Sequence, residues 1–260
     1  MTRRLIAVVA HPDDDTFGCS GTVALHADDP DLRFVLVHAT SGEAGMISDP
    51  SLATRETLGA VREEEDRRSW VALGREPDRH EFLRYPDGGL EDIPFEDLVE
   101  RIGTILREER PNVVMTFGPE GITAHADHIR VGEATSEAFH RCRADAIAGF
   151  QRLLHVAISA SSLAEFSNRL VALGRDPIDP TQPFQPRGVP DETIGVVVDC
   201  SSIVDRKRAA ILEHATQRSD FANIPEELEA EIFRYESHVM AWPGRPAGTP
   251  ELADVFEGLD

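Results

Sequence analysis

The chain has 260 residues, of which 41% are hydrophobic, so it can bury one sizeable core and we expect a single domain over residues 1–260. The formal net charge of −21 argues against a nucleic-acid-binding surface and against binding to an anionic membrane. The sequence shows no transmembrane stretch, no signal-peptide pattern and no metal-type spacing of its three cysteines. We therefore expect a soluble cytoplasmic protein that could form a homo-oligomer.

Short apolar runs alternate with helical patterns in the first part of the chain. Strands are expected at residues 5–10, 32–38, 81–85 and 113–117, and helices at 17–26, 52–74 and 95–106. Gly74 is the expected stop signal of the second helix. Such alternation is typical of βαβ units, so it predicts an α/β fold with a mostly parallel sheet flanked by helices and a core at about 5–145.

The C-terminal third, residues 146–260, is less regular. We expect a strand at 153–159, a helix at 162–173, a last strand at 194–198 and helices in much of the remainder. Residues 176–191 contain five prolines, which excludes regular helix or central strand there. This segment is either a lid or binding loop or an ordered crossover on the surface.

Two clusters of histidine and aspartate follow strand-like runs. His-Pro-Asp-Asp-Asp occupies residues 11–15 directly after the first strand, and His-Ala-Asp-His occupies residues 125–128 after the run at 113–117. Open α/β sheets bind ligands at the C-terminal edge of their strands. Two such strand ends could supply a site of two histidines and one carboxylate with an open position for water.

The spacing suggests a role for each residue. His11 and Asp14 can reach one ion from a single tight turn, and His128 completes the set of ligands. Zinc accepts this mixture, with another divalent metal as the alternative. Asp13 is a candidate general base, and His125 could stabilise an oxyanion or protonate a leaving amine, with Asp127 as its orienting partner. In the alternative interpretation, these residues are helix caps and turn residues.

These motifs resemble the signatures of the PIG-L/LmbE-like deacetylase family. Residues 10–15 match its opening Ala-His-Pro-Asp-Asp-Glu, with Asp15 in place of Glu, and residues 18–22 match the glycine-rich helix start that follows. Residues 125–128 resemble its later His-Pro-Asp-His, with Ala126 in place of Pro. Weaker similarity covers residues 40–45, Arg62 with Glu65, residues 86–89, and Lys207, His214 and Gln217. The resemblance extends from residue 5 to about residue 220.

The resemblance implies a Rossmann-like α/β fold and zinc-dependent removal of an acyl group from a small N-acylated amino sugar or a similar amine. It implies that His11, Asp14 and His128 are metal ligands and Asp13 the general base, while His125 assists the oxyanion and the leaving group. It also implies that Arg62 and Asp87 contact the sugar. In the deacetylase of mycothiol biosynthesis a tyrosine stands where this chain has Thr123, so that tyrosine's role is absent here or comes from elsewhere.

Two other functions stay open. One is an amidase for amino-sugar thiol conjugates of the mycothiol type, and the other is a non-catalytic Rossmann-like binding module, although residues 18–21 lack the G-x-G-x-x-G spacing.

Two further groups of residues have a structural and a functional interpretation. Lys207, Ala210, His214 and Gln217 share one helical face, which is either solvated or directed at the site through His214. Arg62 lies in a charged run over 62–68 that is typical of a solvated helix surface, and the alternative is that its side chain reaches the cavity. The remaining isolated histidines are expected to be structural: His26, His80, His140, His155 and His238.

Overall fold

The computed structural model describes residues 3–218, 224–246 and 248–259, and it confirms the α/β fold. An eight-stranded sheet has the order β3-β2-β1-β4-β5-β8-β7, with β6 beside β5. Every pairing is parallel except those of β8, which is antiparallel to both β5 and β7. The strands are β1 (Arg3–Val9), β2 (Leu32–Thr40), β3 (Arg79–Tyr85), β4 (Val113–Phe117), β5 (Arg152–Ser159), β6 (Gly188–Val189), β7 (Ile194–Asp199) and β8 (Tyr235–Trp242).

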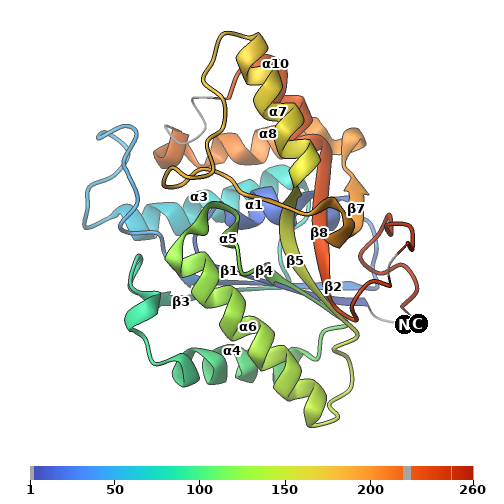
Figure 1. Cartoon of the computed structure of the whole chain (residues 1–260). Coiled ribbons are helices and arrows are strands. Elements are labelled where there is room, and N and C mark those ends of the chain that lie inside the picture. Colours follow the sequence, from blue (N-terminus) through green and yellow to red (C-terminus); the bar gives the residue numbers. More distant parts are fainter. Residues whose placement is uncertain (1–2, 219–223, 247, 260) are drawn as a thin grey trace.

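Helices cover both faces of this sheet. In Figure 1, α4 and α6 lie below it, and α1, α3 and α8 lie above it. The α-helices are α1 (Asp14–Gly18), α2 (Ser20–Leu25), α3 (Leu58–Leu73), α4 (Phe95–Glu109), α5 (Gly121–Ala124), α6 (Ala126–Ala144), α7 (Ala160–Ala172), α8 (Val204–Glu213) and α10 (Glu226–Arg234). Among the described residues, the 3₁₀ turns are η1 (Leu90–Asp92), η2 (Asp191–Thr193), η3 (Ser201–Ile203) and η4 (Ala215–Gln217).

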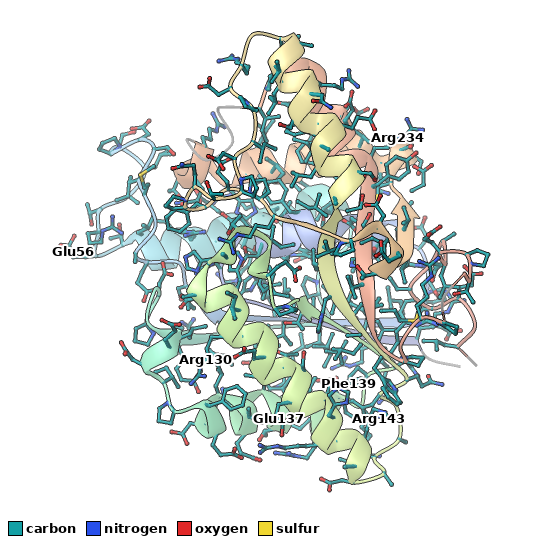
Figure 2. All side chains as sticks on the ribbon, in the orientation of Figure 1. Glu56, Arg130, Glu137, Phe139, Arg143 and Arg234 are labelled. Carbon is teal, nitrogen blue, oxygen red and sulfur yellow. The ribbon has the colours of Figure 1, made fainter. Side chains whose placement is uncertain are left out.

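The apolar patterns account for the central elements. The last five residues of β1 are all buried, as expected for a central parallel strand with helices on both faces. On α4, Leu98, Val99, Ile102, Ile105 and Leu106 form one buried apolar stripe. Phe139 of α6 is fully buried among the side chains that fill the interior in Figure 2. One cluster of buried apolar side chains takes members from residue 5 to residue 256, so both parts of the chain contribute to it.

Two predicted helices have different bounds in the structure. The helix expected at 17–26 is two short helices, α1 and α2, interrupted at Cys19, whose φ of −146° is not helical. The helix expected at 52–74 begins only at Leu58, because the Thr57 hydroxyl accepts the Thr54 N–H at 2.9 Å and closes a turn before it. Gly74 ends this helix with a φ of 80°, as its position predicted.

The prediction of helices in much of the last third was wrong at residues 235–242, which form β8. This strand contains Glu236 and His238, which are polar and buried, so its sequence does not read as an apolar run. Glu236 pairs with the ammonium of Lys207 and accepts the backbone N–H of Gly21 at 2.6 Å. The strand was therefore not recognisable from its hydrophobic pattern, because its buried polar residues are satisfied by partners elsewhere in the fold.

Among the described residues, none of the helices combines the length and the apolar character needed to span a bilayer.

Candidate active site

The first motif forms a strained turn at the end of β1. Asp13 has a φ of 114° and a ψ of −30°, a conformation that residues other than glycine rarely adopt. The next residue closes the turn, since Asp14 Oδ2 accepts the backbone N–H of His11 at 2.7 Å. Strain of this kind persists only where the surrounding structure enforces it, and it is concentrated at functional sites.

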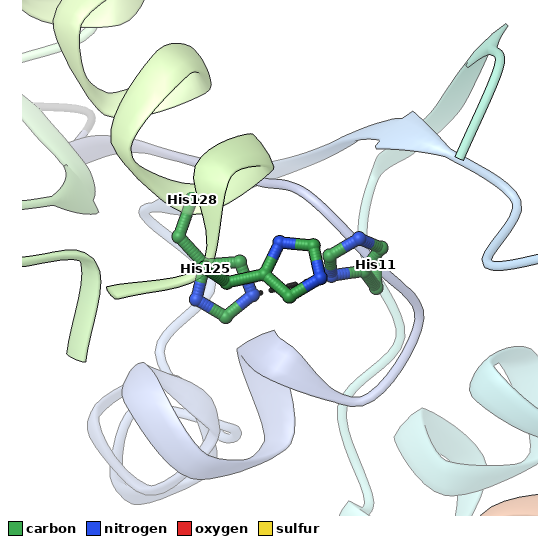
Figure 3. A group of neighbouring side chains, drawn as sticks. All are labelled: His11, His125 and His128. Carbon is green, nitrogen blue, oxygen red and sulfur yellow. Dashed lines mark hydrogen bonds between the residues drawn. The ribbon is translucent and has the colours of Figure 1, made fainter. Parts of the chain in front are cut away.

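Three predicted ligands bring donor atoms to one point. His11 Nδ1 lies 3.2 Å from His128 Nε2 and 3.3 Å from Asp14 Oδ2, and His128 Nε2 lies 3.1 Å from Asp14 Oδ1. Figure 3 shows the rings of His11, His125 and His128 turned toward one another. Ligand atoms at the 2.0–2.1 Å bond length of zinc are about 3.3 Å apart in a tetrahedral site. The donor set therefore fits a zinc-sized divalent ion.

Neighbouring groups orient both imidazoles. His128 Nδ1 lies 3.0 Å from the carbonyl oxygen of Gly121, to which it donates, and the ring stacks on Phe117 with centroids 4.1 Å apart. His11 Nε2 lies 3.0 Å from Asp87 Oδ1 and 3.4 Å from Asp127 Oδ2. In each ring, the nitrogen that carries the proton donates to an oxygen. The other nitrogen points to the place where the donor atoms of His11, Asp14 and His128 meet.

The electrostatics of the site stabilise a positive charge near Asp14 and His11. Burial disfavours a charged Asp14, but His128 and His11 outweigh it and hold the pKa of this carboxyl well below its usual value. Burial likewise opposes a charged His11, yet hydrogen bonds to Asp127, Asp14 and Asp87 raise the pKa of its imidazole well above the usual value. A cation is thus stabilised at this point.

Asp13 lies beside the donor set and is held by Arg62. Burial raises the pKa of Asp13 to about 7, and the Arg62 guanidinium opposes this rise. Arg62 donates to Asp13 Oδ2 at 3.0 Å and to the carbonyl oxygens of Pro12 at 2.7 Å and Gly42 at 2.9 Å. A carboxylate whose pKa is near neutral is suited to exchange protons as a general base.

His125 begins α6 and lies against the two histidine ligands. Its Nδ1 accepts the backbone N–H of Asp127 at 3.2 Å, which caps the helix and places the proton of the neutral ring on Nε2. Its ring centroid is 4.7 Å from that of His11 and 4.9 Å from that of His128. Burial, with His11 and His128, lowers the pKa of His125. The structure thus presents a neutral N–H donor.

Three predicted site residues make contacts other than those expected. Asp127 was expected to orient His125, but its carboxylate lies near His11 and accepts the N–H of Gly88 at 2.7 Å. Asp87, expected at the sugar, pairs with His11, and its Oδ2 accepts the N–H of Ala44 at 2.8 Å. Arg62 is 4% exposed and engaged by the first motif, although a sugar contact was expected.

The stripe that includes His214 is buried rather than solvated, with Lys207, Ala210, His214 and Gln217 all inside the fold. His214 Nε2 lies 3.1 Å from the Thr16 hydroxyl of α1, so it packs behind the first motif. Gln217 donates to the carbonyl oxygen of Met46 at 2.9 Å and holds the loop after β2. These side chains support the loops around the site.

The proline-rich loop reaches the site through Phe184, a residue that the sequence did not single out. Phe184 is 70% exposed, and its ring centroid lies 5.7 Å from that of His125. The backbone N–H of Arg187 donates to the carbonyl oxygen of Ile122 at 2.7 Å, which fixes this loop to the turn before His125. The five prolines of residues 176–191 were a signal for an irregular loop, but no local signal pointed to Phe184.

Comparison with known proteins identifies the family. The family model described as GlcNAc-PI de-N-acetylase, PIG-L, matches residues 6–139. The chain belongs to the PIG-L family. The family resemblance in the sequence motifs is thereby confirmed.

Its curated relatives include two bacterial enzymes, each named 1D-myo-inositol 2-acetamido-2-deoxy-alpha-D-glucopyranoside deacetylase. The protein from Kineococcus radiotolerans is 32% identical over 83% of this chain and 69% of its own length. The protein from Acidothermus cellulolyticus is 30% identical over 100% of this chain and 96% of its own length.

Solved structures share the fold of this PIG-L-family chain. The N,N'-diacetylchitobiose deacetylase from Pyrococcus horikoshii has a TM-score of 0.59 and 22% identity, over 92% of this chain and 83% of its own. GalB, the 4-carboxy-2-hydroxymuconate hydratase from Pseudomonas putida, has a TM-score of 0.64 and 19% identity, over 95% of this chain and 100% of its own. Since one of these proteins is a deacetylase and the other a hydratase, the fold alone does not determine the reaction.

Proposed function

We propose that this chain is a divalent-metal-dependent N-deacetylase that acts on an N-acetylated amino sugar linked to a polyol. The observation that carries the proposal is the convergence of His11 Nδ1, Asp14 and His128 Nε2 within 3.3 Å, with Asp13 in the same turn. Residues that served only as helix caps or turn residues would not be expected to bring their donor atoms together from the ends of two strands.

His11, Asp14 and His128 would hold the metal, with zinc as the first candidate. A second grouping, His11 with His125 and His128, also has donor atoms within 4.8 Å of one another. We favour Asp14 because its two oxygens contact both histidines and because its carboxylate supplies negative charge to the ion. His125 already uses Nδ1 as the cap of α6, which leaves its Nε2–H for substrate.

When bound, zinc supplies a Lewis acid that polarises the acyl carbonyl and increases the acidity of the attacking water. Asp13 takes a proton from that water while Arg62 holds its Oδ2, and the resulting hydroxide attacks the acetyl carbon. His125 Nε2–H is placed to donate to the developing oxyanion. The C–N bond then breaks, Asp13 returns the proton to nitrogen, and acetate and a free amine leave.

The substrate class rests on the names of the relatives and on the loop beside the site. Two relatives at 30% identity or more are named deacetylases of an acetamido-glucopyranoside of inositol. Phe184 places an exposed aromatic ring next to His125, where it can cover one face of a sugar ring. Arg62 and Asp87 would act on the sugar only indirectly, through Asp13 and His11.

The test is the release of a free acid and a free amine by metal-replete protein from four amides: N-acetylglucosaminyl-inositol, N-acetylglucosamine, N,N'-diacetylchitobiose and an amino-sugar thiol conjugate. We expect release from the inositol-linked substrate and its loss after chelation of the metal. Turnover of an amino-sugar thiol conjugate alone would establish the amidase instead. A folded, metal-replete protein that cleaves none of these amides would overturn the proposal and favour a non-catalytic module.

A further inference from the structure

A second group of metal-ligating side chains lies outside the proposed active site. It consists of His38 on β2, Asp66 on α3 and His80 on β3, and one donor atom of each lies within 4.8 Å of the others. We call these residues the β2–β3 cluster. The side chains of His38 and Asp66 are fully buried, and that of His80 is 13% exposed. Because β3 is an edge strand, His80 lies on the side of the cluster nearest to solvent.

One ring nitrogen of the β2–β3 cluster lies equally close to two partners. His80 Nε2 lies 3.2 Å from His38 Nδ1 and also 3.2 Å from Asp66 Oδ2. A neutral ring nitrogen carries either one proton or one lone pair, so it can make only one of these two hydrogen bonds well. Both oxygens of Asp66 are buried, and neither accepts a well-formed hydrogen bond. Burial and the neighbouring Asp15 raise the pKa of Asp66 well above its usual value. A buried carboxyl in contact with two imidazoles therefore either keeps a proton or neutralises a bound cation.

The charge around the β2–β3 cluster points to a cation. Asp15, which is also fully buried, lies with Oδ1 3.1 Å from His38 Nε2, and its Oδ2 accepts the indole N–H of Trp70 at 2.7 Å. The ion pairs of Asp15 and Asp66 in the described part of the chain are with His38 and His80, and none is with lysine or arginine. Two buried carboxylates without a permanent cation either keep a proton or bind a metal.

We propose that His38 Nδ1, His80 Nε2 and Asp66 Oδ2 bind a second divalent metal ion of the zinc type. The two 3.2 Å separations match the spacing of about 3.3 Å between ligand atoms of tetrahedral zinc. Asp15 holds Nε2 of His38 and so leaves Nδ1 to the ion, as carboxylates do beside metal-bound histidines. This ion would join the edge strand β3 to β2 and α3, which is a structural role independent of the proposed reaction.

The experiment counts zinc ions. Protein stripped with a chelator is incubated with zinc alone and dialysed, and the bound zinc is measured by elemental analysis. We expect about two equivalents for the wild type, about one each for His80→Gln and His128→Gln, and none for the double variant. The matched control is His155→Gln, which removes a histidine outside both groups and should keep about two equivalents.

A second readout covers the case in which a variant folds poorly. In the His128→Gln background, zinc should raise the melting temperature, and it should not do so in the double variant. If the active-site proposal is wrong, His128→Gln should bind as much zinc as the wild type, which is a separate outcome. The β2–β3 proposal is overturned if the wild type binds one equivalent and His80→Gln also binds one, as a proton shared by Asp15 and Asp66 predicts. It is likewise overturned if His80→Gln retains two.

Discussion

Replacing Asp87 by asparagine separates a positioning role from a substrate-binding role. Asp87 Oδ1 lies 3.0 Å from His11 Nε2, so the carboxylate should fix the ring and make Nδ1 a better ligand. Loss of such a partner lowers metal affinity by about 10–100-fold. Asp127 Oδ2 stays 3.4 Å from the same nitrogen and compensates in part, so we expect about a tenfold loss, or about 1.4 kcal/mol.

The assay is a zinc titration against a chromophoric chelator, followed by kinetics at saturating zinc. Asp87→Asn should weaken zinc binding and leave the KM for substrate close to the wild-type value, because Asp87 contacts His11 and the backbone of Ala44. The matched control is Asp92→Asn, an exposed change in the same loop that should alter neither quantity. A tenfold higher KM with unchanged zinc affinity would refute the positioning argument and restore the sugar contact implied by the family resemblance.

Three further variants test other parts of the structure. Asp13→Asn should retain zinc and lose about 10²–10⁴-fold in kcat, and loss of metal in step with activity would make Asp13 a ligand. His125→Ala should retain zinc and lower kcat by about 10²–10³-fold with a smaller effect on KM, whereas a near-normal kcat would leave His125 as a helix cap only. His238→Leu should flatten the pH dependence of stability, because burial lowers the pKa of His238 from 6.5 to about 4. The buried neutral ring destabilises the fold little above pH 6.5, and the free energy of unfolding falls as the pH drops from 6.5 toward 4, because the unfolded chain binds the proton more readily. In chemical denaturation, the wild type should therefore lose about 2 kcal/mol more of its free energy of unfolding between about pH 7.5 and pH 5 than His238→Leu does. An unchanged slope would show that this imidazole titrates normally in the fold.

The sequence predicted the fold of the first half because each element there has a local signal. The run at 5–10 is apolar and unbroken, and Pro12 follows it, so the end of β1 and the position of the first motif could be placed. Parallel strands bring their C-terminal ends to one edge, which was sufficient to place His11 and His128 together. The sequence could thus predict that His11 and His128 are neighbours, but not that their ring nitrogens are in contact.

The partners of these residues depend on loop paths that no local pattern encodes. Asp127 contacts His11 because the loop after β3 passes over it and donates the N–H groups of Gly88 and Leu90 to its oxygens, at 2.7 and 3.1 Å. The charged run on α3 was expected to be solvated, yet Arg62 and Glu65 are buried. Glu65 accepts the N–H and hydroxyl of Thr216, a residue far away in the sequence, and this tertiary contact replaces water.

The three consecutive aspartates of the first motif show how position within one turn separates chemical roles. Asp13 faces Arg62, and its pKa rises to about 7, while Asp14 lies between two histidines with its pKa well below the usual value. Asp15 points to the opposite side, toward His38 and Trp70, and although burial opposes its ionisation, His38 lowers its pKa. The family signature has glutamate at this third position, and its longer side chain would not fit the 2.7 Å contact with Trp70 without a shift. The shorter residue therefore belongs with the β2–β3 cluster behind it, so substitution of Asp15 by glutamate should disturb His38 before it disturbs His11.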